Sequence, residues 1–243
     1  MIEIIDLSFS YDESYFVLNS INLRIKKGEF VSILGANGSG KSTLALCISG
    51  LLNPLKGSIL VDGEKPATKA SREKTGILFQ NPDNQILTSI MERELAFTLE
   101  NFGLSYSKMH EKVSKTIKRF NLDKYKNRNP EILSGGEKQK IALASVLISD
   151  PNYLILDEPF SLLPPRSQSD IMELLQEYKN VKDKTVILIT QFPKAALLSD
   201  RIITLEDGGI GRINTPEVIF KDPEYLKRIG IRPLKTNHGG ILS

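Results

Sequence analysis

Gly35-Ala36-Asn37-Gly38-Ser39-Gly40-Lys41-Ser42-Thr43 is the most informative segment of this 243-residue chain. An apolar run, Phe30 to Leu34, precedes it, and a second apolar segment, Leu44 to Ile48, follows it. A strand, a glycine-rich turn, a Lys-Ser pair and a helix in this order are typical of a loop that cradles phosphates, because its backbone N–H groups turn inward around anionic oxygens. Lys41 is expected to bridge the β- and γ-phosphates, and the Ser42 hydroxyl to bind Mg²⁺. The stretch therefore predicts a nucleotide site.

Two acidic residues, Asp157 and Glu158, close a short apolar run, Tyr153 to Leu156. If this run is a strand, both carboxylates lie just beyond the C-terminal edge of the sheet, where phosphates and Mg²⁺ would sit. Asp157 is expected to belong to the coordination sphere of the metal, usually through water, and Glu158 to orient or deprotonate an attacking water. Two solvated acids at a strand end are the plainer alternative, which the phosphate loop makes the weaker one.

Continuous apolar runs predict the centre of the fold. Tyr153 to Leu156 and Val186 to Ile189 are short and wholly apolar, as are strands covered on both faces. Between them, a stripe at helical spacing predicts a crossover helix, and it consists of Ile171, Leu174, Leu175 and Tyr178. Strand–helix–strand repetition around a phosphate loop predicts a doubly wound α/β core.

Weaker patterns predict the elements around this core. Partial alternation over Ile2 to Phe9 and Ile21 to Ile25 predicts half-buried strands. The helix after Lys41 is predicted to stop at Asn53-Pro54, and its apolar face consists of Leu44, Ile48, Leu51 and Leu52. Two further stripes predict packing faces of a small helical subdomain: Met91, Leu95, Leu99 and Phe102, then Met109, Val113, Ile117 and Phe120. A hairpin is predicted from Arg201 to Ile213, and a polar end around His238.

Composition limits the possible partners and compartments. The net charge of +3, from 32 basic and 29 acidic residues, comes without a basic stripe, so no nucleic-acid partner is expected. The single cysteine, Cys47, cannot form an intrachain disulfide, which fits a reducing compartment. No apolar run approaches the roughly 20 residues of a membrane span, and the start, Met1 to Asp6, lacks the pattern of a signal peptide. A cytoplasmic protein is expected, which would reach a membrane only through a partner.

A second glycine-rich motif, Leu133-Ser134-Gly135-Gly136-Glu137, precedes the Asp157-Glu158 strand. A serine and two glycines at a helix start present N–H groups and the positive end of the helix dipole, which makes another anion cradle. A flexible linker is the plainer alternative. With this motif the chain resembles the ATP-binding cassette (ABC) ATPases over nearly its whole length. In that family the motif caps the γ-phosphate bound by an opposing subunit, so that a head-to-tail dimer encloses two ATP molecules.

The resemblance implies a fold, cofactors and further site residues. The implied fold is a P-loop NTPase core with an antiparallel β subdomain and an inserted α-helical subdomain. The implied division is core with β subdomain over 1–84 and 146–214, helical signature subdomain over 85–145, and a short tail over 215–243. The implied cofactors are ATP and Mg²⁺. Tyr11 matches the aromatic residue that stacks on adenine, Gln80 the glutamine that reaches Mg²⁺ and the attacking water, and Ser42, Gln80 and Asp157 would serve the metal.

A narrower resemblance appears around Gln80. The segments Phe79 to Gln85, Glu94 to Phe97 and Glu100 to Leu104 are similar to those of energy-coupling factor (ECF) transporter ATPases. This resemblance implies that residues from Gln80 to Phe102 form a groove for the coupling helices of a transmembrane subunit. That subunit works with an interchangeable membrane component that binds a vitamin or a transition metal ion. The chain is then expected on the inner face of the cell membrane, attached through its partner.

Two positions depart from the family pattern. After the strand Val186 to Ile189 and the threonine that follows it, the family places a histidine, whereas this chain has Gln191. The family also places an aspartate where this chain has Pro164. Glutamine can donate a hydrogen bond but never carries a positive charge, and proline offers neither a carboxylate nor an N–H. We therefore expect a heterodimer with a related ATPase, in which this chain binds ATP, hydrolyses it slowly at its own site with Glu158 and Gln191, and lends its intact signature to the partner.

Two other functions stay open on the sequence. The chain could be a regulatory nucleotide-binding subunit with little turnover, or a soluble ABC ATPase outside transport. The transported substrate cannot be read from the sequence, because the ATPase subunit of a transporter does not touch it.

Overall fold

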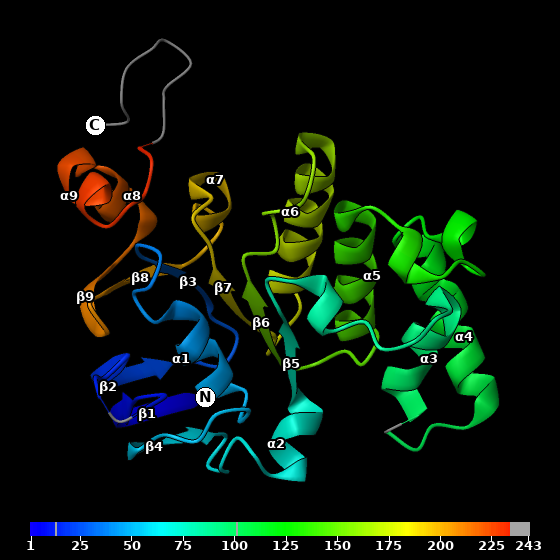
Figure 1. Ribbon diagram of the computed structural model, residues 1–243, viewed down its shortest axis with the longest axis horizontal. Helices are drawn as coiled ribbons and strands as arrows, with labels where there is room; N and C mark the ends of the chain where they lie inside the picture. The colour runs from blue at the N-terminus through cyan, green and yellow to red at the C-terminus, as the bar shows by residue number, and fades with distance from the viewer. Residues whose placement is uncertain (13, 101, 234–243) are drawn as a thin grey trace.

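The computed structural model describes residues 1–12, 14–100 and 102–233. It contains two sheets (Figure 1). The first is antiparallel, in the order β2-β1-β4, and comprises β1 (Ile2–Phe9), β2 (Leu18–Ile25) and β4 (Lys56–Val61). The second has the order β5-β6-β7-β3-β8-β9, and comprises β3 (Phe30–Leu34), β5 (Thr75–Leu78), β6 (Tyr153–Asp157), β7 (Thr185–Ile189), β8 (Arg201–Glu206) and β9 (Gly209–Asn214). All neighbours in it are parallel except β8 and β9.

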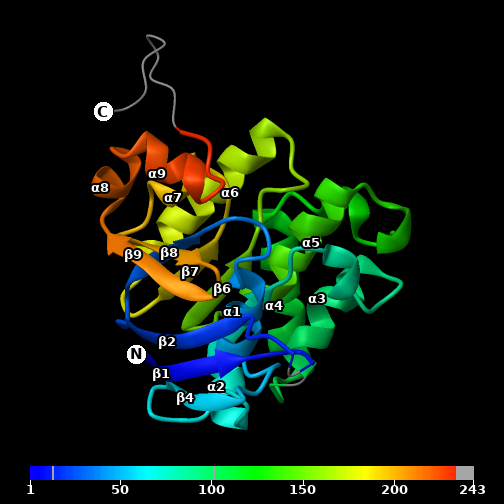
Figure 2. The same cartoon turned by 60° about the vertical axis from the view of Figure 1, so that its left-hand side comes forward.

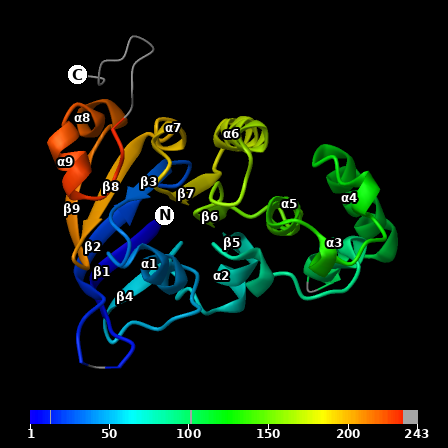
Figure 3. The ribbon, with the colours of Figure 1, turned by 45° about the horizontal axis from the view of Figure 1, so that its top comes forward.

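The helices lie on both faces of the larger sheet. The α-helices are α1 (Lys41–Ile48), α2 (Lys69–Lys74), α3 (Met91–Glu100), α4 (Tyr106–Arg119), α5 (Gly135–Leu147), α6 (Pro165–Lys179), α7 (Pro193–Ala196), α8 (Pro216–Phe220) and α9 (Pro223–Arg228). Three short 3-10 turns are η1 (Pro82–Asn84), η2 (Asp123–Tyr125) and η3 (Pro130–Ile132). Figure 3 shows α1 on one side of this sheet and α6 and α7 on the other.

Alternation along the parallel strands explains this layering. In β6, Tyr153 and Ile155 enter the core shared with α1 and the antiparallel sheet, whereas Leu154 and Leu156 enter the core beneath α5, α6 and α7. Every residue of β3, β6 and β7 is buried, as expected for strands covered on both faces. The predicted P-loop α/β core is confirmed, and so is the burial of its central strands on both faces.

The predicted length of α1 is wrong. The helix ends at Ile48, so that Leu51 and Leu52 lie outside it. Gly50 adopts a left-handed conformation with φ of 76°, and the N–H groups of Gly50 and Leu51 donate to the carbonyls of Cys47 and Leu46. This is the glycine-dependent cap that ends many helices, and it acts before the proline at position 54 can.

The segment between β5 and β6 is mainly helical (Figure 1). The two predicted stripes pack together with α5 in one apolar cluster, whose buried members include Met91, Leu95, Leu99, Val113 and Ile117. Phe102 is the exception, because it follows the end of α3 and is 36% exposed. The division of the chain into domains stays a prediction, since α5 belongs both to this cluster, through Ile141, and to the core of the sheet, through Leu143.

The last described part of the chain forms one edge of the larger sheet and the two helices that pack on it. The predicted hairpin is present as β8 and β9, and α8 and α9 follow it above the same edge (Figure 2). A separate apolar cluster joins α8 and α9 to the sheet through Leu34 and Ile202. The polar end predicted around His238 lies outside the described residues. Across the described part of the chain, no helix is both long and apolar enough to cross a membrane.

Candidate functional site

The glycine-rich stretch forms the turn between β3 and α1, as its flanks predict. Gly35 has no room for a side chain, because a Cβ there would lie 2.3 Å from the carbonyl oxygen of Leu205. Gly40 immediately precedes α1 with φ of 98°, a conformation that favours glycine. The loop therefore depends on glycine at these two positions for its course from strand to helix.

The Lys41 side chain folds back over this loop. Its Nζ donates hydrogen bonds to the carbonyl oxygens of Gly35, at 2.9 Å, and Ala36, at 2.8 Å. Burial lowers the pKa of Lys41, and the negative charges of Glu158 and Asp157 oppose that shift. The ammonium group is thus held among the loop carbonyls, on the side where the two carboxylates lie.

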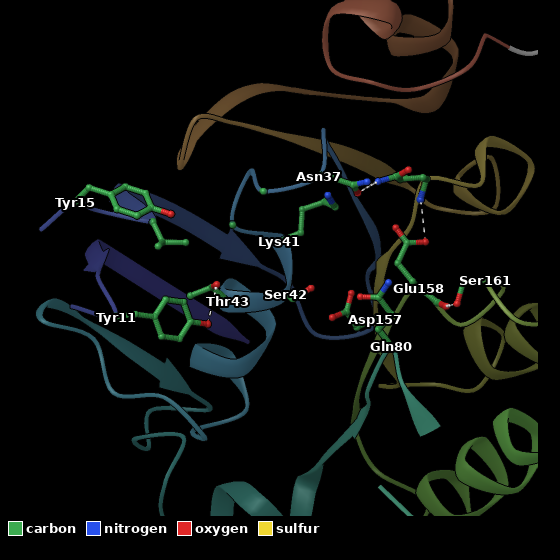
Figure 4. A pocket seen from close by; sticks show the side chains of 14 residues that line it. Tyr11, Tyr15, Asn37, Lys41, Ser42, Thr43, Gln80, Asp157, Glu158 and Ser161 are labelled. Atoms are coloured by element: carbon green, nitrogen blue, oxygen red, sulfur yellow. Dashed lines mark hydrogen bonds between the residues drawn. The ribbon is translucent and has the colours of Figure 1, made fainter. Parts of the chain in front are cut away.

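These residues line a pocket of about 560 Å³ (Figure 4). The predicted site residues among its walls are Tyr11, Asn37, Gly38, Gly40, Lys41, Ser42, Thr43, Gln80, Asp157, Glu158 and Gln191. Gly35, Ala36 and Ser39 belong to the loop without lining the pocket. The structure therefore brings together, in one pocket, residues that lie far apart in the sequence, from Tyr11 to Gln191.

Asp157 ends β6 with a carboxylate that suits a hard cation. Its Oδ1 atom is buried and has no hydrogen-bond partner among the described residues. Burial raises the pKa of Asp157, while a hydrogen bond from Ser42 and the charge of Lys41 oppose the shift. A buried carboxylate oxygen without a partner, next to a hydroxyl, is the type of donor set that Mg²⁺ prefers when phosphate supplies its other ligands. The residues present therefore fit Mg²⁺.

Glu158 is held in a strained conformation at the end of the same strand. Its φ of 47° is rare for a residue other than glycine, and such strain is often found at functional sites. Its N–H donates to the carbonyl of Ile189 at 2.9 Å, and its Oε2 accepts from the N–H of Gln191 at 3.2 Å. Burial raises the pKa of Glu158, which the Gln191 hydrogen bond and Lys41 oppose. A carboxylate with a raised pKa, fixed beside a phosphate loop, can act as a base.

Gln191 reaches the phosphate loop with its side chain. Its Nε2 donates a hydrogen bond to Oδ1 of Asn37, which Figure 4 draws as a dashed line. The same residue contacts Glu158 through its backbone. Gln191 therefore connects the candidate base with the loop, but it does so with a neutral amide.

Two tyrosines line the pocket on the side away from Asp157 and Glu158 (Figure 4). The hydroxyl of Tyr11 forms a 3.2 Å hydrogen bond with Oγ1 of Thr43, and its ring packs edge-on against Phe9. Tyr11 and Tyr15 are 64% and 65% exposed. Both rings thus leave most of their surface to a ligand, as an aromatic wall for a nucleobase would.

Three lining residues were not predicted from the sequence, namely Tyr15, Val17 and Ser161. Tyr15 was visible as the second aromatic residue of the turn that contains Tyr11. Val17 and Ser161 carried no signal of their own. Ser161 is turned toward Glu158, whose carbonyl accepts from its N–H and its hydroxyl.

The signature motif lies elsewhere. The Ser134 side chain accepts from the N–H of Glu137, and the Glu137 carboxylate accepts from the N–H of Ser134, so that α5 begins with a capping box. Gly136 is close to the loop after β6, since a Cβ there would lie 3.2 Å from the carbonyl oxygen of Leu162. None of residues 134–137 is among those that line the pocket described above.

A mainly parallel sheet with a glycine-rich loop at its centre, and a capped Ser-Gly-Gly helix start outside the pocket, fit an ABC-type ATPase. The family model described as ABC transporter matches residues 18–161, and the chain belongs to this family. It is accordingly an ATP-binding protein and an ATP hydrolase of the ABC class.

Curated relatives share about two-fifths of the sequence. The chain is 40% identical to the energy-coupling factor transporter ATP-binding protein EcfA of Syntrophomonas wolfei, over 98% of this chain and 89% of the relative. It is 42% identical to the protein of the same name from Pediococcus pentosaceus, over 95% and 84%. The resemblance to ECF transporter ATPases inferred from the segments around Gln80 is thereby confirmed.

Solved structures agree in fold. CbiO1 of Clostridium perfringens, described as part of the ABC transporter complex cbiONQ, superposes with a TM-score of 0.79 at 32% identity, over 94% of each chain. The dimeric ATP-binding cassette MJ0796 bound to ADP and Pi superposes with a TM-score of 0.81 at 29% identity, over 89% of this chain and 99% of that one.

Proposed function

We propose that this chain is an ATPase subunit of an ECF-type importer, and that it powers uptake of a vitamin or a transition metal ion by closing a dimer around ATP. The names of the EcfA relatives and the description of cbiO1 as part of a transporter complex support the proposal. The proposed location is the inner face of the cell membrane, reached through a transmembrane coupling subunit.

One observation carries the proposal of a shared site. The chain has a phosphate loop that lines its own pocket, and a capped signature helix start that does not line it. Two anion-binding features that do not meet within one chain can meet across a head-to-tail dimer. We therefore assign residues 134–137 to ATP bound by a second ABC ATPase subunit.

The two ATP sites of the proposed dimer would differ in their rate of hydrolysis. Gln191 supplies a neutral amide where the family places a histidine, and Pro164 offers no carboxylate to the partner. Glu158, Lys41 and the signature are nevertheless intact. We propose that this chain is the catalytically weaker half of a heterodimer, with slow hydrolysis at its own loop and productive hydrolysis at the loop of the partner.

We propose roles for the residues of the pocket on the geometry given above. Gly35 to Thr43 and Tyr11 bind ATP, with Lys41 at the β- and γ-phosphates. Mg²⁺ would be held by Ser42, Gln80 and Asp157, and it would neutralise phosphate charge during hydrolysis. Glu158 holds the proton-accepting position, and Gln191 fixes its carboxylate through the 3.2 Å backbone hydrogen bond.

The groove for the transmembrane partner is proposed along the segment from Gln80 to Phe102. A cavity of about 270 Å³ opens there between β5, α3 and α5, and its walls include the apolar side chains of Ile77, Leu87, Phe97, Phe102 and Val146. Such a surface suits the apolar side of an inserted helix. We propose it as the docking site of a coupling helix.

Co-purification tests the proposed function. The tagged chain should be isolated from detergent-solubilised membranes of its own source, and the proposal expects a second ABC ATPase and a transmembrane subunit in the complex. Recovery of neither would contradict it. A soluble ABC ATPase would be recovered without membrane proteins. A regulatory subunit, which the neutral Gln191 favours as the second candidate, would be recovered with them, but the Gln191→His variant would add no turnover.

A further inference from the structure

The end of α9 lies against the phosphate loop. Gly230 follows the helix with φ of 73°, and a Cβ at this glycine would lie 3.3 Å from Cα and 3.4 Å from Cβ of Ala36. A contact of 3.3 Å is tighter than most real Cβ contacts, so that a side chain at position 230 requires Ala36 or the helix end to shift by a few tenths of an ångström. The two contacting residues are almost 200 positions apart in the sequence.

The helix end is fixed by its own hydrogen bonds. The N–H of Gly230 donates to the carbonyl of Lys227 at 3.1 Å, and the N–H of Ile231 donates to that of Leu226 at 2.8 Å. These are the two bonds of a glycine-dependent C-cap. The cap therefore determines where Gly230 stands relative to the helix axis.

The helix itself is anchored to the strands that carry the loop. Leu226, Ile229 and Ile231 are buried in the cluster that contains Leu34, the last residue of β3 before the loop. The hydroxyl of Tyr225 donates to Oε1 of Glu206 at 2.6 Å, which ties α9 to β8. Because α9 is attached to β3 and β8 of the same sheet, its position relative to the phosphate loop is fixed.

Ala36 is hydrogen-bonded to Lys41, so the position of Ala36 affects that of the Lys41 side chain. The carbonyl oxygen of Ala36 accepts from Nζ of Lys41 at 2.8 Å and from the N–H of Ser39 at 3.2 Å. A displacement of Ala36 moves this acceptor, and with it the Lys41 ammonium group that is proposed to bind the phosphates.

We propose that Gly230 is a positioning residue for ATP: the capped end of α9 sets the place of Ala36, and through its carbonyl the place of Lys41. The inference rests on the proposed role of the loop as the ATP site. It adds the segment after β9 to the parts of the chain that determine phosphate affinity, and it assigns the Gly230–Ala36 contact a role besides stability.

Titration of ATP and adenosine onto the full-length chain tests this proposal. Gly230→Ala should bind ATP about threefold to tenfold more weakly than the wild type, a change of roughly 0.7 to 1.4 kcal/mol, while adenosine, which has no phosphates, should bind equally well. Gly63→Ala is the matched control, because Gly63 has φ of 82° and a Cβ added to it would meet nothing within 4 Å. That variant carries the same kind of backbone strain without a contact, and it should keep the ATP affinity of the wild type.

A second variant guards against misfolding. Gly230→Asn places the same Cβ against Ala36, and asparagine tolerates a positive φ better than alanine does. It should show the same selective loss for ATP. Wild-type affinity for ATP in both folded variants would overturn the inference. If the wild type itself failed to bind ATP, the assignment of the loop would fail instead, and the two failures are thus distinguishable.

Discussion

The side-chain amide of Gln191 donates a hydrogen bond to the side-chain oxygen of Asn37, and so joins the residue after β7 to the phosphate loop. The backbone N–H of Gln191 also holds the Glu158 carboxylate, at 3.2 Å. Gln191 thus lies between the candidate base and the phosphate loop, where a charged imidazole could stabilise the charge that develops during hydrolysis. An amide can hold the geometry, but it cannot supply the charge.

Gln191→His should raise the rate of ATP hydrolysis at this site. Loss of one transition-state contact typically lowers turnover by about 10²–10³-fold, and we expect the histidine to restore at least about tenfold of this. The rate of phosphate release at saturating ATP measures the effect. Gln191→Asn, which keeps an amide but shortens the side chain, should not accelerate the reaction. Equal rates for the wild type and the histidine variant would contradict the role given to Gln191.

Glu158→Gln should stabilise the fold at neutral pH. Burial holds the pKa of Glu158 above its usual 4.5, so that ionisation of the folded state costs free energy as the pH rises through this higher pKa. Glutamine removes this cost and keeps the left-handed backbone conformation. The melting temperature at pH 7 should rise by about 2–4 °C for each kcal/mol gained, and the gain should vanish below about pH 4.5.

The control for this experiment is Glu173→Gln, a substitution on the exposed face of α6. It should leave the melting temperature nearly unchanged at both pH values. A lower melting temperature for Glu158→Gln at pH 7 would show that the carboxylate stabilises the fold, contrary to the burial argument.

Asp157→Asn should weaken Mg²⁺ binding without abolishing nucleotide binding. The unpartnered Oδ1 of Asp157 is the atom that we assign to the metal or its water. Loss of such an outer-sphere partner typically costs about 10–100-fold in metal affinity. Titration of Mg²⁺ onto the ATP-loaded chain measures it, and ATP affinity in EDTA serves as the internal control. A metal affinity equal to that of the wild type would remove Asp157 from the site.

Tyr11→Ala should weaken ATP binding, whereas Tyr11→Phe should weaken it little. Stacking of a ring on a base contributes ~1–3 kcal/mol, which corresponds to about fivefold or more in affinity. Phenylalanine keeps the ring and loses only the 3.2 Å hydrogen bond to Thr43. Inorganic triphosphate, which has no base, should bind all three proteins alike. A loss in the phenylalanine variant as large as in the alanine variant would assign the effect to the hydroxyl.

Much of the fold could be predicted because its signals are local. The strands β6 and β7 are continuous apolar runs, and the turn from β3 to α1 has glycines where side chains do not fit. The predicted end of α1 is wrong by several residues, because the left-handed cap at Gly50 ends the helix before the proline at position 54. Both signals end helices, and the sequence alone did not rank them.

The site was predictable where a motif marks it and hidden where tertiary contacts build it. Asp157 and Glu158 lie at the end of β6, and Lys41 begins the helix that follows the phosphate loop, so that the motifs themselves mark these three positions. Ser161 and the approach of Gly230 to Ala36 depend on how loops and α9 pack, which no local spacing encodes. Such contacts join residues that are distant in the chain, and they required the structure.

We propose that this chain hydrolyses ATP slowly at its own loop and lends its signature to a partner. The most direct test compares two variants within the complex co-purified with this chain: Glu158→Gln, in the loop site, and Ser134→Arg, in the signature. We predict that Glu158→Gln keeps more than roughly half of the ATPase rate, while Ser134→Arg lowers it by about 10²-fold or more. The opposite result, loss of activity with Glu158→Gln and little change with Ser134→Arg, would contradict the account.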